Sequence, residues 1–178
     1  ERVDNEQYWG NSENVKSWAL RASIEEGTDF ERLNRVNGHL FLETASRLGF
    51  SSNLNYFTEE RLDGSTDWAV LHDYNALFRF TEGTWLEMHI GLGARFWTDS
   101  FGTCGGVNGL YRADIFPIKP LHLTGLFEVG NIRQALVLHT QATIGVSYKH
   151  GELMIGYDFL HIHTTNLQGP FVGLRLWF

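Results

Sequence analysis

The sequence predicts an all-β protein, a closed antiparallel up-and-down β-barrel of ten strands. Apolar and polar residues alternate along almost the whole chain, which is the period of a half-buried strand. Glycine is frequent, with 19 of 178 residues, whereas only three prolines occur. Ten strands are many for an open sheet, and closure removes the edges through which sheets aggregate. A closed barrel is therefore favoured, with eight strands as the alternative.

The strands are predicted where alternation holds between turn signals. In residues 85–98, the even positions from Leu86 to Phe96 are all apolar, whereas Glu87 and Arg95 stand at odd positions. The same two-faced pattern recurs in every other predicted strand. The ten predicted strands are 15–25, 35–45, 48–58, 67–80, 85–98, 106–116, 121–130, 134–149, 152–164 and 170–178.

The connections between these strands fall into a tight set and a longer set. Antiparallel neighbours alternate ends, so the two sets are expected at opposite ends of the barrel. The longer connections are 26–34, 59–66 and 99–105, with 131–133 as a short exception at the same end. The segment 99–105 is rich in glycine, so we expect a surface loop in which Cys104 is an exposed thiol.

Composition excludes several classes of protein. Lys and Arg total 14 against 21 Asp and Glu, a net charge of −7, so no nucleic-acid partner is expected. Aromatic residues make up 14% of the chain, too much for a disordered segment. The single cysteine excludes an internal disulfide and Cys-rich metal sites, and neither a cofactor nor a metal is predicted. No apolar run is long enough for a transmembrane helix. We divide the chain into a polar N-terminal leader, 1–14, and one barrel domain, 15–178.

Alternation alone does not say which face of the barrel points outward. If the apolar face meets lipid, the ionisable residues fill the lumen and must be paired, because an unpaired buried charge is costly. The predicted polar network of the lumen is Arg21, Asp73, Arg79, Glu87, Arg95, Arg112, Asp114, Glu128, Asp158 and Arg175. Together with Glu43, these residues are five Arg and six acids, the balance that a paired interior requires. The predicted lipid-facing residues are Leu86, Met88, Ile90, Leu92, Leu136, Leu138, Ile144, Val172, Leu174, Leu176 and Phe178.

Aromatic residues gather at the end of the barrel with the tight turns. Such a ring sits at headgroup level in membrane barrels, which favours the outward orientation of the apolar face. The residues concerned are Trp18, Phe80, Trp85, Phe116, Tyr148, Trp177 and Phe178.

The last segment, Gly173 to Phe178, alternates and closes on a C-terminal Phe. It resembles the terminal signature of bacterial outer-membrane β-barrel proteins, a class whose last aromatic residue is read by the assembly machinery. The resemblance implies a transmembrane barrel in the outer membrane, surrounded by lipid and lipopolysaccharide. It also implies that the tight turns and both termini are periplasmic and that the longer loops lie outside.

The predicted function is structural rather than catalytic. Inward-pointing long side chains leave little room for a channel in a ten-strand barrel, so paired polar residues are expected to close the lumen. Loops 26–34, 59–66 and 99–105 are expected to anchor or bind a protein partner in the envelope or at the cell surface. A soluble ligand-carrying barrel, with its apolar face inside, is one alternative.

A lipid A ester hydrolase is the other alternative. The string His163-x-Thr165-Asn166 is similar to the His-x-Ser-Asn motif of outer-membrane lipid A 3-O-deacylases, in which the His activates the Ser. Here the nucleophile would be Thr165, and no acid follows it to orient the His. His161 and His163 also have the spacing of a metal pair, but nothing supplies a third ligand. If the phase of residues 153–159 continues, both histidines face outward, and a bulge near Leu160 would instead turn Leu160 and Ile162 outward.

Overall fold

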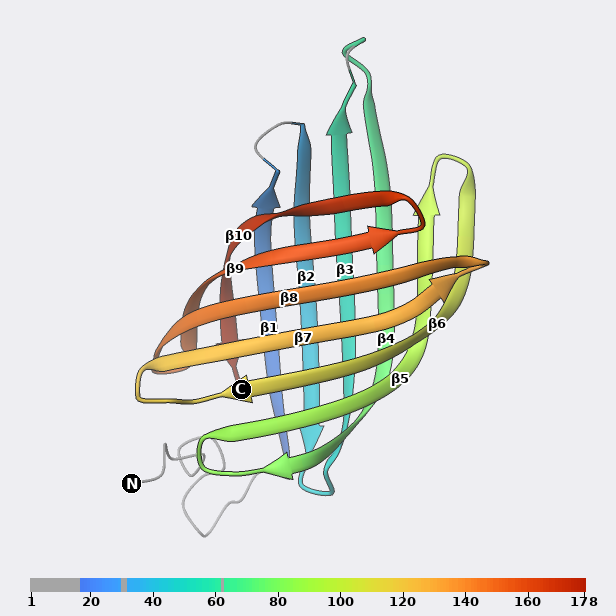
Figure 1. Cartoon of the computed structure of the whole chain (residues 1–178). Coiled ribbons are helices and arrows are strands. Elements are labelled where there is room, and N and C mark those ends of the chain that lie inside the picture. Colours follow the sequence, from blue (N-terminus) through green and yellow to red (C-terminus); the bar gives the residue numbers. More distant parts are fainter. Residues whose placement is uncertain (1–16, 30–31, 62) are drawn as a thin grey trace.

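The computed structural model describes residues 17–29, 32–61 and 63–178, which form a closed barrel of ten antiparallel strands (Figure 1). The predicted leader 1–14 lies outside the described residues. No helix long and apolar enough to cross a membrane occurs in these described ranges. The strands are β1 (Trp18–Thr28), β2 (Leu33–Thr44), β3 (Leu48–Glu60), β4 (Thr66–Glu82), β5 (Leu86–Asp99), β6 (Gly102–Ile115), β7 (Leu121–Ile132), β8 (Ala135–Tyr148), β9 (Gly151–Ile162) and β10 (Thr165–Trp177).

Each strand pairs with its neighbours in the sequence, and β1 closes the barrel against β10. The closing register places Arg21 opposite Trp177 and Gly27 opposite Phe171. The register of β4 and β5 shifts once, between Arg79 and Thr81. The predicted up-and-down barrel of ten strands is confirmed, and the eight-strand alternative is wrong.

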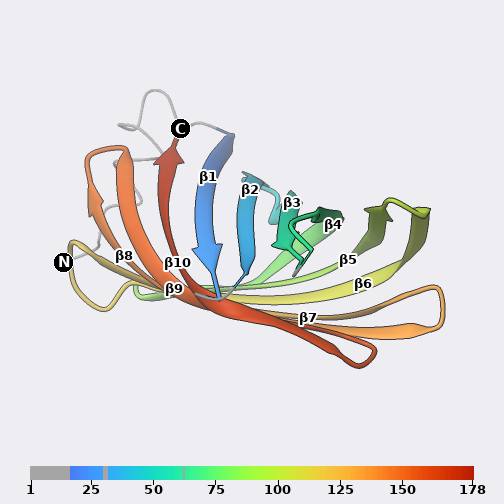
Figure 2. The ribbon, with the colours of Figure 1, turned by 90° about the horizontal axis from the view of Figure 1, so that it is seen from above.

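The two walls of the barrel cross one another. In Figure 1, β2 to β4 run steeply across β7 and β8, and β5 and β6 bend from one wall into the other; Figure 2 shows that β10 runs beside β1 and then turns into the second wall. Side chains that point inward from crossing walls can meet in the middle of the barrel. We call the end where β1 begins and β10 ends the proximal end, and the opposite end the distal end.

The connections at the two ends of the barrel are of similar length, so the prediction of a tight set at one end and a longer set at the other is wrong. At the distal end, β1 and β2 are joined by residues 29–32, and β5 and β6 only by Ser100 and Phe101. At the proximal end, 116–120 is as long as the distal connection 61–65. The described strands extend further at the distal end than the alternation predicted, which shortens all three predicted loops.

The segment 99–105 is mostly strand rather than surface loop, because β6 begins at Gly102. Cys104 is partly buried and packs against apolar side chains inside the barrel, so the expectation of an exposed thiol is wrong. The glycines of this segment allow β6 to lie very close to β7. A Cβ on Gly106 would lie 1.8 Å from the carbonyl oxygen of Asn131 on β7.

Gly93 provides a test of strand approach within the barrel. It lies between Asn75 and Asn108 on the neighbouring strands, and a Cβ there would lie 1.9 Å from the carbonyl oxygen of Tyr74. We expect Gly93→Ala to lower the free energy of unfolding by about 2 kcal/mol, because backbone must move. Gly125, which has no atom within 4 Å of such a Cβ, is the matched control. Gly125→Ala should change stability by less than about 0.5 kcal/mol. Urea unfolding in detergent micelles, followed by tryptophan fluorescence, measures both, and equal effects would contradict the expectation.

Candidate functional site

The inner surface of the barrel carries the charged residues. All ten residues predicted for the lumen network are at most 6% exposed. Of the predicted lipid-facing residues, Leu92 is 77% and Leu136 is 59% exposed, whereas Leu86, Met88 and Leu138 are partly buried. The remaining ones, Ile90, Ile144, Val172, Leu174, Leu176 and Phe178, are 48% to 57% exposed.

A chain of alternating charges runs through the distal half of the lumen. Arg95 donates from Nε to Asp73 Oδ1 at 2.5 Å and from Nη2 to Glu128 Oε2 at 2.7 Å. His139 Nδ1 lies 2.9 Å from Glu128 Oε2, and its Nε2 lies 2.8 Å from Asp158 Oδ2. Carboxylates only accept hydrogen bonds, so these contacts suit the imidazolium form, in which both ring nitrogens donate.

The same chain then crosses the lumen. Arg35 on β2 contacts Asp158 on β9 at 2.8 Å, although β1 and β10 stand between these strands in the sheet. Arg35 also pairs with Glu25 at 3.1 Å, and Glu25 accepts a hydrogen bond from Gln141 on β8 at 2.8 Å. We name these residues the distal ion chain, which consists of Asp73, Arg95, Glu128, His139, Asp158, Arg35 and Glu25. It connects opposite walls of the barrel.

Asp114 and Glu152 are the centres of a second charged cluster in the proximal half. Arg112 donates two hydrogen bonds to the Asp114 carboxylate, of 2.8 and 2.9 Å, and Arg21 Nη1 donates a third at 3.1 Å. His122 bridges from Asp114 at 3.2 Å to Glu152 at 3.0 Å.

Arg175 and Trp177 complete the surroundings of Glu152. Arg175 Nη1 donates to Glu152 at 3.0 Å, and the Trp177 indole N–H donates to it at 3.2 Å. Glu43 lies beside this group and pairs with Arg79 and Arg21. We name these residues the proximal ion cluster, which consists of Asp114, Glu152, Glu43, Arg112, Arg21, Arg79, Arg175 and His122. In this cluster and in the distal ion chain, each carboxylate lies against at least one cation.

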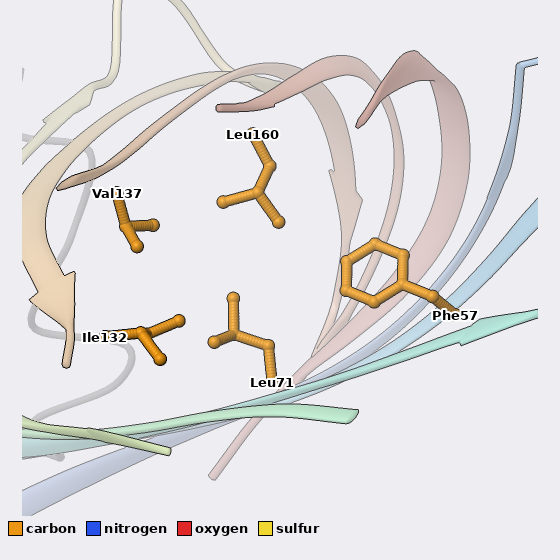
Figure 3. Close-up of a cluster of buried hydrophobic side chains, with 5 residues drawn as sticks. All are labelled: Phe57, Leu71, Ile132, Val137 and Leu160. Carbon is orange, nitrogen blue, oxygen red and sulfur yellow. The ribbon is translucent and has the colours of Figure 1, made fainter. Parts of the chain in front are cut away.

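Apolar side chains also fill the lumen, which the sequence analysis did not predict. At the distal end, five buried residues form the distal apolar cluster, and Leu33, Trp97, Cys104, Ile162 and Leu167 pack against it (Figure 3). Its members are Phe57, Leu71, Ile132, Val137 and Leu160. A second buried group, Phe41, Leu77, Leu110 and Leu126, adjoins the proximal ions, with the Arg21 guanidinium 4.0 Å from the centre of the Phe41 ring. The lumen is therefore filled by both ion pairs and apolar contacts.

Several network residues were missed at the ends of predicted strands. Glu25 ends the predicted strand 15–25, Arg35 begins 35–45, and Glu152 begins 152–164. Their positions follow the inward phase of β1, β2 and β9, so extending the alternation to the strand ends would have found them.

The string around His163 does not assemble a catalytic pair. His163 lies exposed in the β9–β10 turn with φ 56°, and among the described residues no hydrogen bond joins it to Thr165. Instead, Asn166 Oδ1 accepts a hydrogen bond from His161 Nδ1 at 2.6 Å. The predicted bulge near Leu160 is absent from the described β9–β10 pairing, and both Leu160 and Ile162 point inward. No group of three or more potential metal ligands lies together among the described residues.

The predicted ring of proximal aromatics divides between the two faces. Trp18, Phe80, Trp85, Tyr148 and Phe178 are exposed. Phe116 instead stacks on His122, with ring centres 4.6 Å apart, and Trp177 binds Glu152. For these two residues the predicted outward position is wrong, because each caps the proximal ion cluster from the barrel mouth.

Comparison with known proteins identifies no family for this chain. No family model and no curated protein matches the sequence. Among solved structures, the N-terminal β-barrel domain of OprF from Pseudomonas aeruginosa is similar, with 9% identity, a TM-score of 0.43, and coverage of 90% of this chain and 97% of that one. Ail, the attachment invasion locus protein of Yersinia pestis, is similar with 10% identity, a TM-score of 0.39, and coverage of 91% and 97%. At these scores the likeness assigns no function, so function is argued from the barrel's own residues.

Arg95 provides a test of the buried network. Arg95→Met leaves Asp73 and Glu128 buried without their main cation, and we expect a loss of about 3 to 5 kcal/mol in the free energy of unfolding. The control is Arg61→Met, which breaks an exposed pair with Asp67 and should cost less than about 1 kcal/mol. Urea unfolding of both variants measures the difference, and a cost for Arg95→Met as small as that of the control would argue against a network that stabilises the barrel.

Proposed function

We propose that this chain is a small outer-membrane β-barrel with a structural role, which anchors or binds another envelope component through its distal end. One observation carries the proposal: the barrel has its charges inside and its apolar side chains outside. Each of the ten strands contributes exposed large apolar side chains, such as Ile24 on β1, Ile90 on β5 and Val172 on β10. Soluble monomers rarely expose apolar surface on this scale, whereas lipid requires it.

The proposed placement in the outer membrane is supported by the alternation of residues 173–178. On β10, Leu174 and Leu176 are exposed, as is Phe178 after the strand, while Arg175 points into the lumen. This is the alternation that the resemblance to outer-membrane barrel proteins implies. Periplasmic termini, with the distal end outside, are part of the same proposal.

A structural role is favoured over transport because both ion networks and the distal apolar cluster fill the lumen. A soluble ligand-carrying barrel would have its apolar face inside, and the buried charges of Asp73, Arg95 and Glu128 do not fit that arrangement. No observation favours the lipid A hydrolase, since His163 and Thr165 are not hydrogen-bonded in the described structure.

Charge placed on the outer face distinguishes a lipid-facing surface from a wet one. Leu92 lies in the middle of β5 and is 77% exposed, whereas Tyr148 ends β8 and is 76% exposed. We expect Leu92→Arg to cost about 2 to 4 kcal/mol of folding free energy in phospholipid vesicles, because the charge lies at mid-bilayer depth. Tyr148→Arg, near the interface, should cost about 0 to 1 kcal/mol. Equal and small costs for both variants would contradict a membrane-spanning barrel.

Fractionation and conductance test the proposed role directly. The full chain, expressed in a Gram-negative host, should extract with the outer membrane and show heat-modifiable migration on gels, because the closed barrel resists unfolding by detergent. In planar bilayers it should give no stable open-channel conductance, since the lumen is filled. Recovery of the folded chain without detergent would contradict the membrane placement, and a steady conductance would contradict the closed lumen.

A further inference from the structure

A pocket of about 220 Å³ opens at the distal mouth of the barrel. Its floor is formed by Leu33, Phe57, Trp97 and Leu167, which belong to or pack against the distal apolar cluster. Because this cluster closes the lumen below it, the pocket has no route through the barrel.

Aromatic rings line much of the pocket. Phe57 and Trp97 stack with ring centres 6.2 Å apart and an interplanar angle of 30°. Phe101, 96% exposed, adds a ring at the rim from the β5–β6 hairpin. Electron-rich ring faces in a partly desolvated mouth attract cations.

Carboxylates complete the lining. Among the described residues, the pocket is lined by Glu59, Asp67 and Asp99 and by no Lys, Arg or His. Asp99 accepts a hydrogen bond from the Trp97 indole at 2.9 Å, so its charge is held at the ring edge. Asp67 is paired with Arg61, whereas Glu59 has no ion pair or side-chain hydrogen bond in the described part of the chain.

We propose that this distal pocket binds an organic ammonium group, either on a small free amine or on a lysine side chain of a partner protein. The aromatic floor receives the alkyl part and the ring faces attract the charge, while Glu59 and Asp99 supply carboxylates that have no ion pair in the described part of the chain. The volume suits one side chain or a small cation rather than a drug-sized ligand, for which pockets of about 300 to 1,000 Å³ are usual.

The inference deepens the proposed binding role of the distal end and rests on that role. It does not depend on where the barrel resides, because the pocket is formed by the ends of paired strands and short hairpins. Strand pairing places Glu59 opposite Asp67, and Ala69 opposite Asp99, so the carboxylates come from three adjacent strands. The carboxylates therefore need no loop rearrangement to face the same mouth.

The experiment is calorimetric titration of the full chain, folded in detergent micelles, with two cations and their neutral analogues. The cations are choline and the peptide N-acetyl-Gly-Lys-Gly-amide; the uncharged analogues are 3,3-dimethylbutan-1-ol, which has carbon in place of the choline nitrogen, and N-acetyl-Gly-norleucine-Gly-amide. We expect millimolar binding of a cation and no measurable binding of its analogue. Binding should weaken in 0.5 M salt because the charges are near the surface.

Matched variants assign the binding to the pocket. Glu59→Gln should weaken cation binding about 3-fold, while Glu60→Gln, one residue along and outside the pocket lining, should leave it unchanged. Trp97→Leu should weaken binding about 3- to 5-fold, and Trp85→Leu, at an exposed tryptophan of the proximal end, should not.

Each outcome decides the inference. Binding of choline alone supports a free amine as the ligand, and binding of the lysine peptide alone supports a partner's side chain; both support the ammonium site. Equal binding of the neutral analogues, or no binding of either cation, overturns it. If the chain fractionates with the outer membrane but binds no cation, the inference fails and the membrane proposal stands. If the chain binds a cation but stays folded without detergent, the inference stands and the membrane proposal fails.

Discussion

The structure depends on one constraint, which is that every charge turned into the closed sheet must find an opposite charge there. Closing the barrel with its apolar face outward encloses more than ten ionisable groups, and an isolated buried charge would cost several kcal/mol. The distal ion chain satisfies this constraint by alternation, with Arg95 between two acids and His139 between two more. Strand order, register and the identity of the inward residues are consequently linked, because a slip of one residue would place these side chains on the outer face.

Most of the fold could be predicted because its signal is local. The alternation of apolar and polar residues identified all ten strands. The phase of the alternation placed Arg95 and Glu128 on the inner face of the barrel and Ile90 and Leu92 on the outer face. Strand ends were predicted less well, since glycine signals a turn and a close strand approach equally. The run Gly102 to Gly106 was interpreted as a loop. At Gly106, however, the backbone of Asn131 on β7 lies so close that only a residue without a side chain fits.

The contents of the lumen were harder to predict than its walls. Which acid meets which cation depends on how the two walls cross, and no local pattern contains that information. The Arg35–Asp158 pair joins residues on β2 and β9, which are far apart in sequence and are not neighbours in the sheet. The distal apolar cluster was missed for a related reason. Phe57, Leu71 and Leu160 occupy inward positions near strand ends, where the expectation of a polar lumen left no place for them.

The contacts between opposite walls have a mechanical consequence. A closed sheet with only neighbour pairing can flatten or widen under lateral stress, since its hydrogen bonds run around the circumference and not across it. In this barrel, Arg35 to Asp158 and Glu25 to Gln141 act as struts across the lumen between strands that are not neighbours in the sheet, attached to walls that run at a steep angle to one another. The cross-section is thereby braced from within, so the rim at the distal mouth keeps its shape when the surroundings compress or stretch the wall.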